Sequence, residues 1–389
     1  MKCPVCGEEK VIKSGKIKAD RVFRTATKVE LFQSYKCMRG HRFDGNTTGK
    51  YTNSFVEWVV YVYLRSLSLN RTIDIVRATH ERNILSKGNL LTMIERVTDE
   101  LPTHGDINRL FHPQRTGHLA FDAVFFKWRR VGFGVMFAFD PKTFDIVYYQ
   151  MALNEGKKYW EEFVKKTSFH FKKQGIKPVA IYSDGAKYLV PAIRKHFQGI
   201  PHQLCIVHKL VRMGQQVPIK SVHRSKKMSD KEKELILAFK HWFERVIFAD
   251  TREDSVKRMK HLKDWVKRHP DPRFQKATNG LNRNFKLTLT HFNYDDVFRD
   301  NNMIEGFNSI IKTKLKLFKG FKKIQNIKRW LKLILLDYRF RPMRETRNKD
   351  TRNSSPLERA FANIPDHFNW IKMLRISLKL NYLNLPKKP

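Results

Sequence analysis

Apolar residues recur at helical spacing between residues 52 and 100 of this chain. This spacing predicts three short amphipathic helices. Ser68 or Asn70 would cap the second helix and Ser86 the third, because their side chains accept hydrogen bonds from the free N–H groups of a helix start. Such a trio is typical of a helix-turn-helix-like unit that binds DNA, predicted here over residues 50–102, although a helical linker domain would show the same pattern.

The pattern changes to strands after a predicted linker at residues 102–117, which is rich in His, Pro and Gly. Three strands are expected first, the last two joined by a hairpin turn, and then helices and strands alternate. This order predicts an α/β fold with an RNase H-like mixed sheet. The predicted strands are 118–126, 131–139, 144–151, 178–182 and 203–207, and the predicted helices between them are 157–173 and 186–197.

Strand patterns disappear after residue 210, and amphipathic helical patterns take their place. We therefore expect an all-helical insertion before the last helices of the RNase H-like core. Helical spacing returns over residues 302–319 and 325–340. The predicted domains from residue 115 onward are the first part of the core (115–210), the helical insertion (211–299), the last core helices (300–341) and a basic C-terminal region (342–389).

Three of the four cysteines lie in the first 37 residues, which suits a metal site better than a disulfide framework. Cys3 and Cys6 form one knuckle, and Cys37 and His41 form another. Three thiolates and one imidazole complete a tetrahedral Zn²⁺ shell. The sequence therefore predicts a zinc ribbon over residues 1–48, with incidental cysteines in a loop as the alternative.

The charge of the chain narrows the choice of partner. Lys and Arg number 77 against 37 acidic residues, a formal net charge of +40. Self-repulsion of this size favours a polyanionic partner, and nucleic acid is the first candidate. A membrane partner is not expected, because the longest apolar runs are far shorter than the ~20 residues that span a bilayer. Residues Met1–Gly7 do not resemble a signal peptide, so a reducing, cytoplasmic compartment is predicted.

Three acidic residues occupy sequence positions where a carboxylate could bind a metal ion or take part in catalysis. Asp122 interrupts an apolar strand, where an ionised group must be paired or bind a metal, so a buried arginine is its structural alternative. Asp184 ends a strand just before Gly185, where ligands collect in α/β sheets but where turn chemistry is also common. Glu305 lies near a helix start, where it would also form a capping box with Asn302.

In-line cleavage of a phosphodiester with two metal ions requires about three converging carboxylates, with the ions ~3.5–4 Å apart. Mg²⁺ prefers oxygen ligands, so Asp122, Asp184 and Glu305 suit it. A run of basic residues without an acidic one begins at Lys312, on the helix face of Glu305, and would follow a DNA backbone, with a solvated helix face as the alternative. The residues predicted to contact DNA are Lys312, Lys314, Lys316, Lys319, Lys322 and Lys323.

These local contexts resemble those of insertion-sequence transposases of the Mutator-like DDE superfamily. The resemblance covers about residues 118–340. It implies an RNase H-like core interrupted before its last helix, Mg²⁺ or Mn²⁺ at Asp122, Asp184 and Glu305, and recognition of terminal inverted repeats by the N-terminal part. The matching segments are Asp122 in the first strand, Ser183-Asp184-Gly185, Cys205-Ile-Val-His208 and Asn302-Met-Ile-Glu305-Gly-Phe-Asn308.

The resemblance implies a transposase that cleaves double-stranded DNA at the ends of its element and joins them to target DNA. It further implies a homo-oligomer that acts near the nucleoid of a prokaryotic cell. Cys205 and His208 lack two ligands for zinc, so a structural or positioning role is expected for them. A structure-specific nuclease with the same core, or a transposase-derived DNA-binding regulator without catalysis, are the alternative functions.

Overall fold

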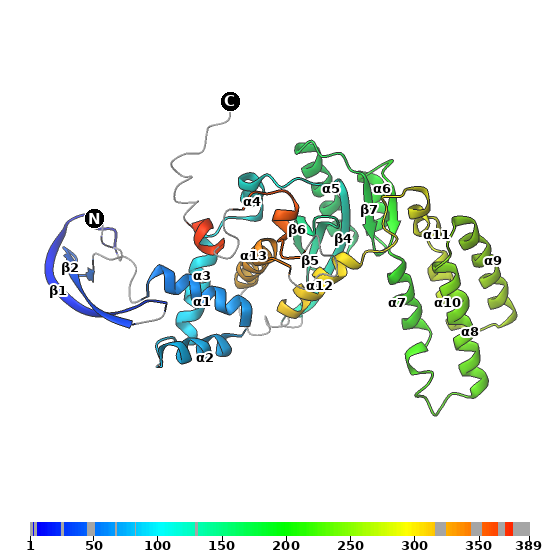
Figure 1. Cartoon of the computed structure of the whole chain (residues 1–389), viewed down its shortest axis with the longest axis horizontal. Coiled ribbons are helices and arrows are strands. Elements are labelled where there is room, and N and C mark those ends of the chain that lie inside the picture. The colour runs from blue at the N-terminus through cyan, green and yellow to red at the C-terminus, as the bar shows by residue number, and fades with distance from the viewer. Residues whose placement is uncertain are drawn as a thin grey trace. The chain divides into compact units, whose positions relative to one another are not determined.

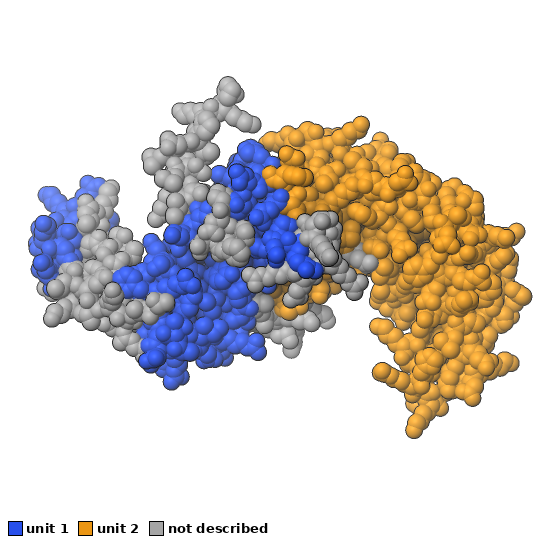
Figure 2. Space-filling model, viewed as in Figure 1, with its two compact units in different colours: residues 1–112, 316–358, 362–389 blue, residues 113–315, 359–361 orange. Residues whose placement is uncertain are grey.

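The structure is a computed structural model that divides into two compact units, coloured separately in Figure 2. Unit 1 comprises residues 1–112, 316–358 and 362–389, and unit 2 comprises residues 113–315 and 359–361. The residues that the structure describes are 3, 6–24, 27–44, 51–66, 68–81, 83–128, 131–315, 324–343, 352–364 and 370–375.

Unit 1 begins with a three-stranded antiparallel sheet in the order β1-β2-β3. Two tight turns precede and follow its long strands, and in each a glycine has a positive φ, +73° at Gly7 and +84° at Gly40. Such angles are open to glycine but strained for other residues. The strands are β1 (Val11–Val22), β2 (Thr27–Cys37) and β3 (Arg42–Asp44).

The helices of unit 1 confirm the predicted starts. The Ser68 hydroxyl accepts a hydrogen bond from the backbone of Arg71, and Ser86 accepts one from Asn89. The predicted linker is wrong in part, because a Thr103–Asp106 capping box starts a further short helix there. The first four helices are α1 (Asn53–Ser66), α2 (Leu69–His80), α3 (Lys87–Glu100) and α4 (His104–Phe111).

Helix α13 (Ile324–Phe340) belongs to unit 1, whereas the sequence placed it with the last core helices. The physical reason is its set of partners. Its fully buried Asp337 forms an ion pair with Arg65 of α1, and its Trp330 packs edge-on against Tyr63, with ring centroids 4.5 Å apart. Since a buried carboxylate must have a partner, Asp337 ties α13 to α1.

Most of the described part of the C-terminal region also packs within unit 1. Arg375 forms ion pairs with Glu57 and Glu100, with nitrogen–oxygen distances of 2.8 and 2.7 Å. Before it, the short helix α14 (Pro356–Arg359) has proline in its first turn, and the Ser355 hydroxyl caps it by accepting the backbone N–H of Glu358.

Unit 2 contains a five-stranded mixed sheet in the order β6-β5-β4-β7-β8 (Figure 1). Strands β4, β5 and β6 are antiparallel neighbours, whereas β7 runs parallel to both β4 and β8. The α/β class and the strand order along the chain are therefore as predicted. The strands are β4 (His118–Trp128), β5 (Val131–Asp140), β6 (Asp145–Ala152), β7 (Ala180–Ser183) and β8 (His202–Leu204).

Helices cover both faces of this sheet. Helices α5 (Lys157–Lys173) and α6 (Leu189–His196) pack on one face of the sheet and bury the side chains there, among them Phe121 of β4. Because side chains alternate along a strand, Asp122 lies on the opposite face, beside its cross-strand partner Phe137. Helix α12 (Asn302–Leu315) packs there, and its Phe307 contacts Phe137 with ring centroids 4.8 Å apart.

The chain between β8 and α12 is helical and has its own apolar core. Within it Phe239 stacks on Phe274, with ring centroids 4.5 Å apart. No helix in the described ranges is both long and apolar enough to cross a membrane. The α-helices are α7 (Ile206–Gln216), α8 (Asp230–Ile247), α9 (Arg252–Arg268), α10 (Pro272–Asn282) and α11 (Phe285–Thr288).

Replacing Phe239 by alanine should destabilise this helical region by about 3–5 kcal/mol, because the fully buried ring leaves a cavity. Leu237 on the same helix is 36% exposed and provides the control: its alanine variant should lose less than about 1 kcal/mol. Urea unfolding followed by tryptophan fluorescence measures both, since Trp265 lies beside Phe239. Equal losses in the two variants would contradict the observed packing.

Candidate active site

Asp122 and Asp184 lie beside each other on neighbouring parallel strands. The register pairs Phe121 of β4 with Ser183 of β7, so the next residue of each chain segment is one of the two aspartates. Gly185 follows with a φ of +79°, which turns the chain sharply at the end of β7. Asp184 therefore lies at the carboxyl end of a strand, the edge of an α/β sheet where ligands bind.

The side chain of Asp122 is held by two hydrogen bonds. Its Oδ1 accepts the backbone N–H of Ala123 at 2.7 Å, and its Oδ2 accepts from the amide Nδ2 of Asn308 on α12 at 2.7 Å. Among the described residues no arginine pairs with it, so the ion-pair alternative is not observed. Asn308 is a site residue that sequence analysis quoted but gave no role.

Burial and the negative charge of Asp184 raise the pKa of Asp122 from 3.8 to about 7. The charge of Glu305 raises this pKa further, while the Ala123 N–H and the charge of Lys312 lower it. Asp184 and Glu305 thus lie close enough to Asp122 for their charges to change its pKa. A cation at this place would relieve their repulsion.

Glu305, in the first turn of α12, faces the start of α7. Its Oε1 lies 3.2 Å from Nδ1 of His208 and accepts from the thiol of Cys205 at 3.9 Å. The Cys205 sulfur also accepts the backbone N–H of Asn301 at 3.3 Å. Burial raises the pKa of Cys205 to about 12, so this thiol stays protonated at neutral pH.

The sequence suggested an isolated Cys-x2-His pair, but in the structure a third possible ligand lies beside it. Cys205, His208 and Glu305 bring their ligand atoms within 4.8 Å of one another. The sequence could not show this, because Glu305 comes from a helix one hundred residues further along the chain. Cys205 was predicted in a strand, but β8 ends at Leu204 and Cys205 is the residue directly before α7.

Asp184 has an arginine partner that the sequence analysis missed. Its Oδ2 lies 2.9 Å from Nη2 of Arg212 on α7, and its Oδ1 accepts the backbone N–H of Ala186 at 2.8 Å. The second contact is the turn chemistry that was the alternative explanation for Asp184. The only sequence signal for Arg212 is its position one helical turn after His208.

The three carboxylates fit divalent cations by their chemistry, since all their ligand atoms are oxygens. In the described part of the chain, the groups of ligand atoms within 4.8 Å of one another are the N-terminal cysteines with His41 and the Cys205 set. Asp122, Asp184 and Glu305 are thus spread more widely than the shell of one ion. Such a spread would suit more than one divalent ion better than a single one.

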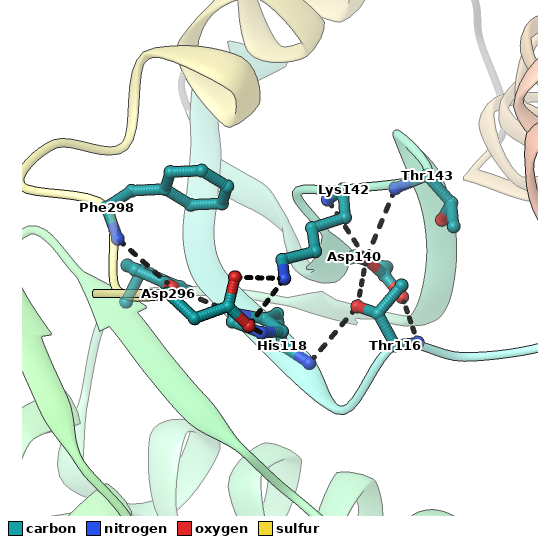
Figure 3. A network of polar contacts seen from close by, with 8 residues as sticks. Thr116, His118, Asp140, Lys142, Thr143, Asp296 and Phe298 are labelled. Atoms are coloured by element: carbon teal, nitrogen blue, oxygen red, sulfur yellow. Dashed lines mark hydrogen bonds and ion pairs between the residues drawn. The ribbon is translucent and has the colours of Figure 1, made fainter. Parts of the chain in front are cut away.

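A polar network fixes the loop that leads into α12 (Figure 3). Asp296 in this loop accepts from Lys142 Nζ at 2.6 Å and lies 3.1 Å from Nε2 of His118. The other ring nitrogen of His118 lies 2.9 Å from the hydroxyl of Tyr182 on β7. The backbone N–H of Phe298 in the same loop donates to that hydroxyl at 3.4 Å. The loop is thus held to β4 and β7, which sets where α12 begins and where Glu305 lies.

The predicted DNA-contacting lysines have different outcomes. Lys312 is exposed, and its charge acts on Asp122, as expected for a residue on the face of Glu305. Lys314 differs from the prediction: it is only 4% exposed, because it follows Ile311 and Phe307 at helical spacing on the packed face. Lys316, Lys319, Lys322 and Lys323 lie outside the described residues.

The four predicted zinc ligands of unit 1 come together. The sulfurs of Cys6 and Cys37 are 3.9 Å apart, and Nδ1 of His41 lies 3.5 Å from Cys37 and 3.9 Å from Cys3. Tetrahedral Zn²⁺ with ordinary bond lengths would separate its ligand atoms by about 3.5–3.8 Å. The cysteines form no disulfide, and Cys3 and Cys37 are buried, so the set fits zinc.

A comparison with known protein families gives a match. The family model described as "Transposase, Mutator family" matches residues 43–341, which is most of the chain. The chain therefore belongs to the Mutator family of transposases.

Two solved structures are similar to parts of this chain. The Drosophila P element transposase strand transfer complex is 13% identical and covers 84% of this chain and 93% of its own, with a TM-score of 0.30. The simian T-cell lymphotropic virus intasome in complex with PP2A regulatory subunit B56 gamma is 9% identical and covers 50% and 69%, with a TM-score of 0.20. At these TM-scores the likeness assigns no residue a role. No curated protein matches the chain.

The raised pKa of Asp122 predicts how stability depends on pH in metal-free protein. Between about pH 4 and pH 7 the folded state holds a proton on Asp122 that the unfolded state has released, so stability should fall as pH rises through this window. Asp122→Asn should remove this loss and be the more stable protein above pH 7, by an amount on the order of a few kcal/mol. Unfolding in EDTA across this range measures it, and parallel pH curves for the two proteins would contradict it.

Proposed function

We propose that this chain is a catalytically active DDE transposase, which cleaves double-stranded DNA at the ends of its element and joins them to target DNA. The observation that carries the proposal is the register of β4 and β7, which sets Asp122 beside Asp184. The electrostatic effect of Glu305 on Asp122 supports a shared site. Membership of the Mutator family supports the same reaction class.

Asp122, Asp184 and Glu305 would hold Mg²⁺ or Mn²⁺. When bound, such ions activate the attacking oxygen and stabilise the leaving oxygen of an in-line displacement. The chain's own residues orient these ligands: Asn308 holds the carboxylate of Asp122, and His208 with Cys205 holds that of Glu305. Cys205 and His208 are thus proposed as positioning residues.

The reaction would consist of two displacements at phosphorus. In the first, water attacks the phosphate at the element end, loses a proton, and breaks the bond to the 3′-oxygen, which leaves as a free 3′-hydroxyl. In the second, that hydroxyl attacks a phosphate of target DNA and displaces a target 3′-oxygen. The exposed ammonium of Lys312 would attract the DNA phosphate to the carboxylates.

The sheet of unit 2, with α5 and α6 on one face and α12 on the other, supports an RNase H-like core. The helical region from α7 to α11 would then be an insertion in that core. Helices α1–α3 are proposed to bind the terminal inverted repeats, aided by the zinc ribbon. Because two ends must be joined to one target, the active form is proposed to be a homo-oligomer.

Asp122→Asn, Asp184→Asn and Glu305→Gln should each lower DNA cleavage by about a thousandfold or more, because losing a metal ligand removes several kcal/mol of transition-state stabilisation. The measurement is nicking of labelled DNA that carries the element's ends, with Mg²⁺ and with EDTA. Glu162→Gln is the matched control, since this carboxylate of α5 forms its ion pair with Lys166.

The same gel separates the alternatives. A product in which the labelled end is joined to target DNA distinguishes a transposase from a nuclease, which would cleave without joining. Tight binding without cleavage under every metal condition would favour the DNA-binding regulator. Cleavage retained in all three carboxylate variants would overturn the site assignment.

The N-terminal cluster should bind one Zn²⁺ per chain, because its ligand atoms are spaced for a tetrahedral shell. Cys37→Ser should lose the metal and lower affinity for the element ends, since small modules of this kind need metal to fold. Elemental analysis measures the zinc, with Cys205→Ser as the control that keeps it. Full zinc content in Cys37→Ser would show that the metal lies elsewhere.

A further inference from the structure

Two pockets lie beside Asp184 in unit 2 and share part of their walls. The larger, of about 620 Å³, lies between α7 and α10, and the smaller, of about 410 Å³, reaches α6. Gly185, Arg283 and Asn284 line both pockets, so the two adjoin one another, and together they are here called the basic groove. Because Gly185 directly follows Asp184, the groove begins at a proposed catalytic carboxylate.

The charged side chains of the basic groove all have the same sign. None of the described residues that line it is acidic. Like charges gathered in this way repel one another unless a polyanion lies between them. The basic lining residues are Lys187, Arg194, Lys209, Arg212, Lys276 and Arg283.

Lys209 of α7 joins the two helices that line the larger pocket of the groove. Its buried ammonium donates to the carbonyls of Gly280 and Arg283, at 3.0 and 2.9 Å, at the C-terminal end of α10. Helix ends leave such carbonyls unpaired, so a cation there is favourable. Burial, with the charges of Arg212 and Arg283, lowers the pKa of Lys209 to about 8. Lys209 therefore fixes α10 to α7 and holds the backbone of Arg283 at the junction of the two pockets.

Arg212 connects the groove to the proposed catalytic residues. Its guanidinium lies 2.9 Å from Asp184 and donates to the carbonyl of Gly185 at 3.4 Å. Beyond it, Arg194, Lys276 and Arg283 are exposed, and no ion pair to an acidic side chain is observed for them among the described residues. Small-molecule sites are mostly apolar with few polar groups, whereas this lining suits a repeating anion.

We propose that the basic groove binds the sugar-phosphate backbone of the DNA strand that leads away from the reacting phosphate at Asp184. Arg194, Lys276 and Arg283 contact its phosphates. This inference rests on the proposed function for the location of the reacting phosphate. It assigns part of the helical region between β8 and α12 a direct role in holding DNA.

The test compares two triple variants of the full chain that lose the same charge. The groove variant is Arg194→Ala/Lys276→Ala/Arg283→Ala, and the control is Lys257→Ala/Lys260→Ala/Lys263→Ala, on the exposed surface of α9. Fluorescence anisotropy without added divalent ions gives the affinity for a labelled DNA duplex as a function of salt. Each lost phosphate contact lowers the slope of log K against log salt by about 0.9, so the groove variant should lose about 2 to 3 units of slope. The control should lose less than about 1 unit.

A cross-linking measurement tests the location without changing any charge. A photoreactive phenylalanine analogue replaces Gln275, which lines the groove, or His261, which is exposed on α9. Irradiation with labelled DNA should give a cross-link from position 275 and none from position 261. Equal slopes in the two triple variants, or no cross-link from position 275, would overturn the proposal.

The outcomes separate this inference from the proposed function. If the wild-type chain cleaves and joins DNA but position 275 gives no cross-link, the groove proposal fails and the transposase proposal stands. If the wild-type chain never cleaves but the slope and cross-link results are as expected, the DNA contact stands and the catalytic proposal fails.

Discussion

The charge of Asp122 within an apolar strand is the constraint on which unit 2 depends. An ionised carboxylate between two apolar neighbours is unfavourable, and the nearby Asp184 and Glu305 make it more so. The fold nevertheless holds Asp122 there, by pairing β4 with β7 on one side and packing α12 over it on the other. An arrangement that costs free energy without a cation, and that the surrounding core holds in place, is typical of a functional site.

Helix α12 links core packing to the site through neighbouring residues. Phe307 packs on the aromatic rings of β5, and the next residue, Asn308, donates to Asp122. Glu305, less than a turn earlier, points toward His208 of α7 instead. Any shift of Phe307 in the core would therefore move a ligand and a hydrogen-bond donor together. The loop held by Asp296 and His118 gives this helix a defined start.

The sequence predicted the parts of this structure that depend on local pattern. The strand order, the serine caps of α2 and α3, and the helical region after β8 follow from periodicity and cap chemistry, which act over a few residues. Pairings between distant segments were not predictable. Asp337 with Arg65, Asp184 with Arg212, and Glu305 with Cys205 each join residues whose contact no local pattern encodes. The burial of Lys314 was missed because helical spacing alone does not show how wide the packed face of a helix is.

The discontinuity of unit 1 has a consequence for how the chain is made. Helix α13 leaves the ribosome only after residues 113–315 of unit 2, yet it supplies Asp337 to Arg65 and Trp330 to Tyr63. Until then α1 lacks these partners, and the apolar surface that Trp330 covers stays open to solvent. Domains generally fold as they emerge, so unit 1 would be the last part to finish although its synthesis begins first. A copy of the gene truncated after α12 would encode all three carboxylates and still leave unit 1 unable to complete its core.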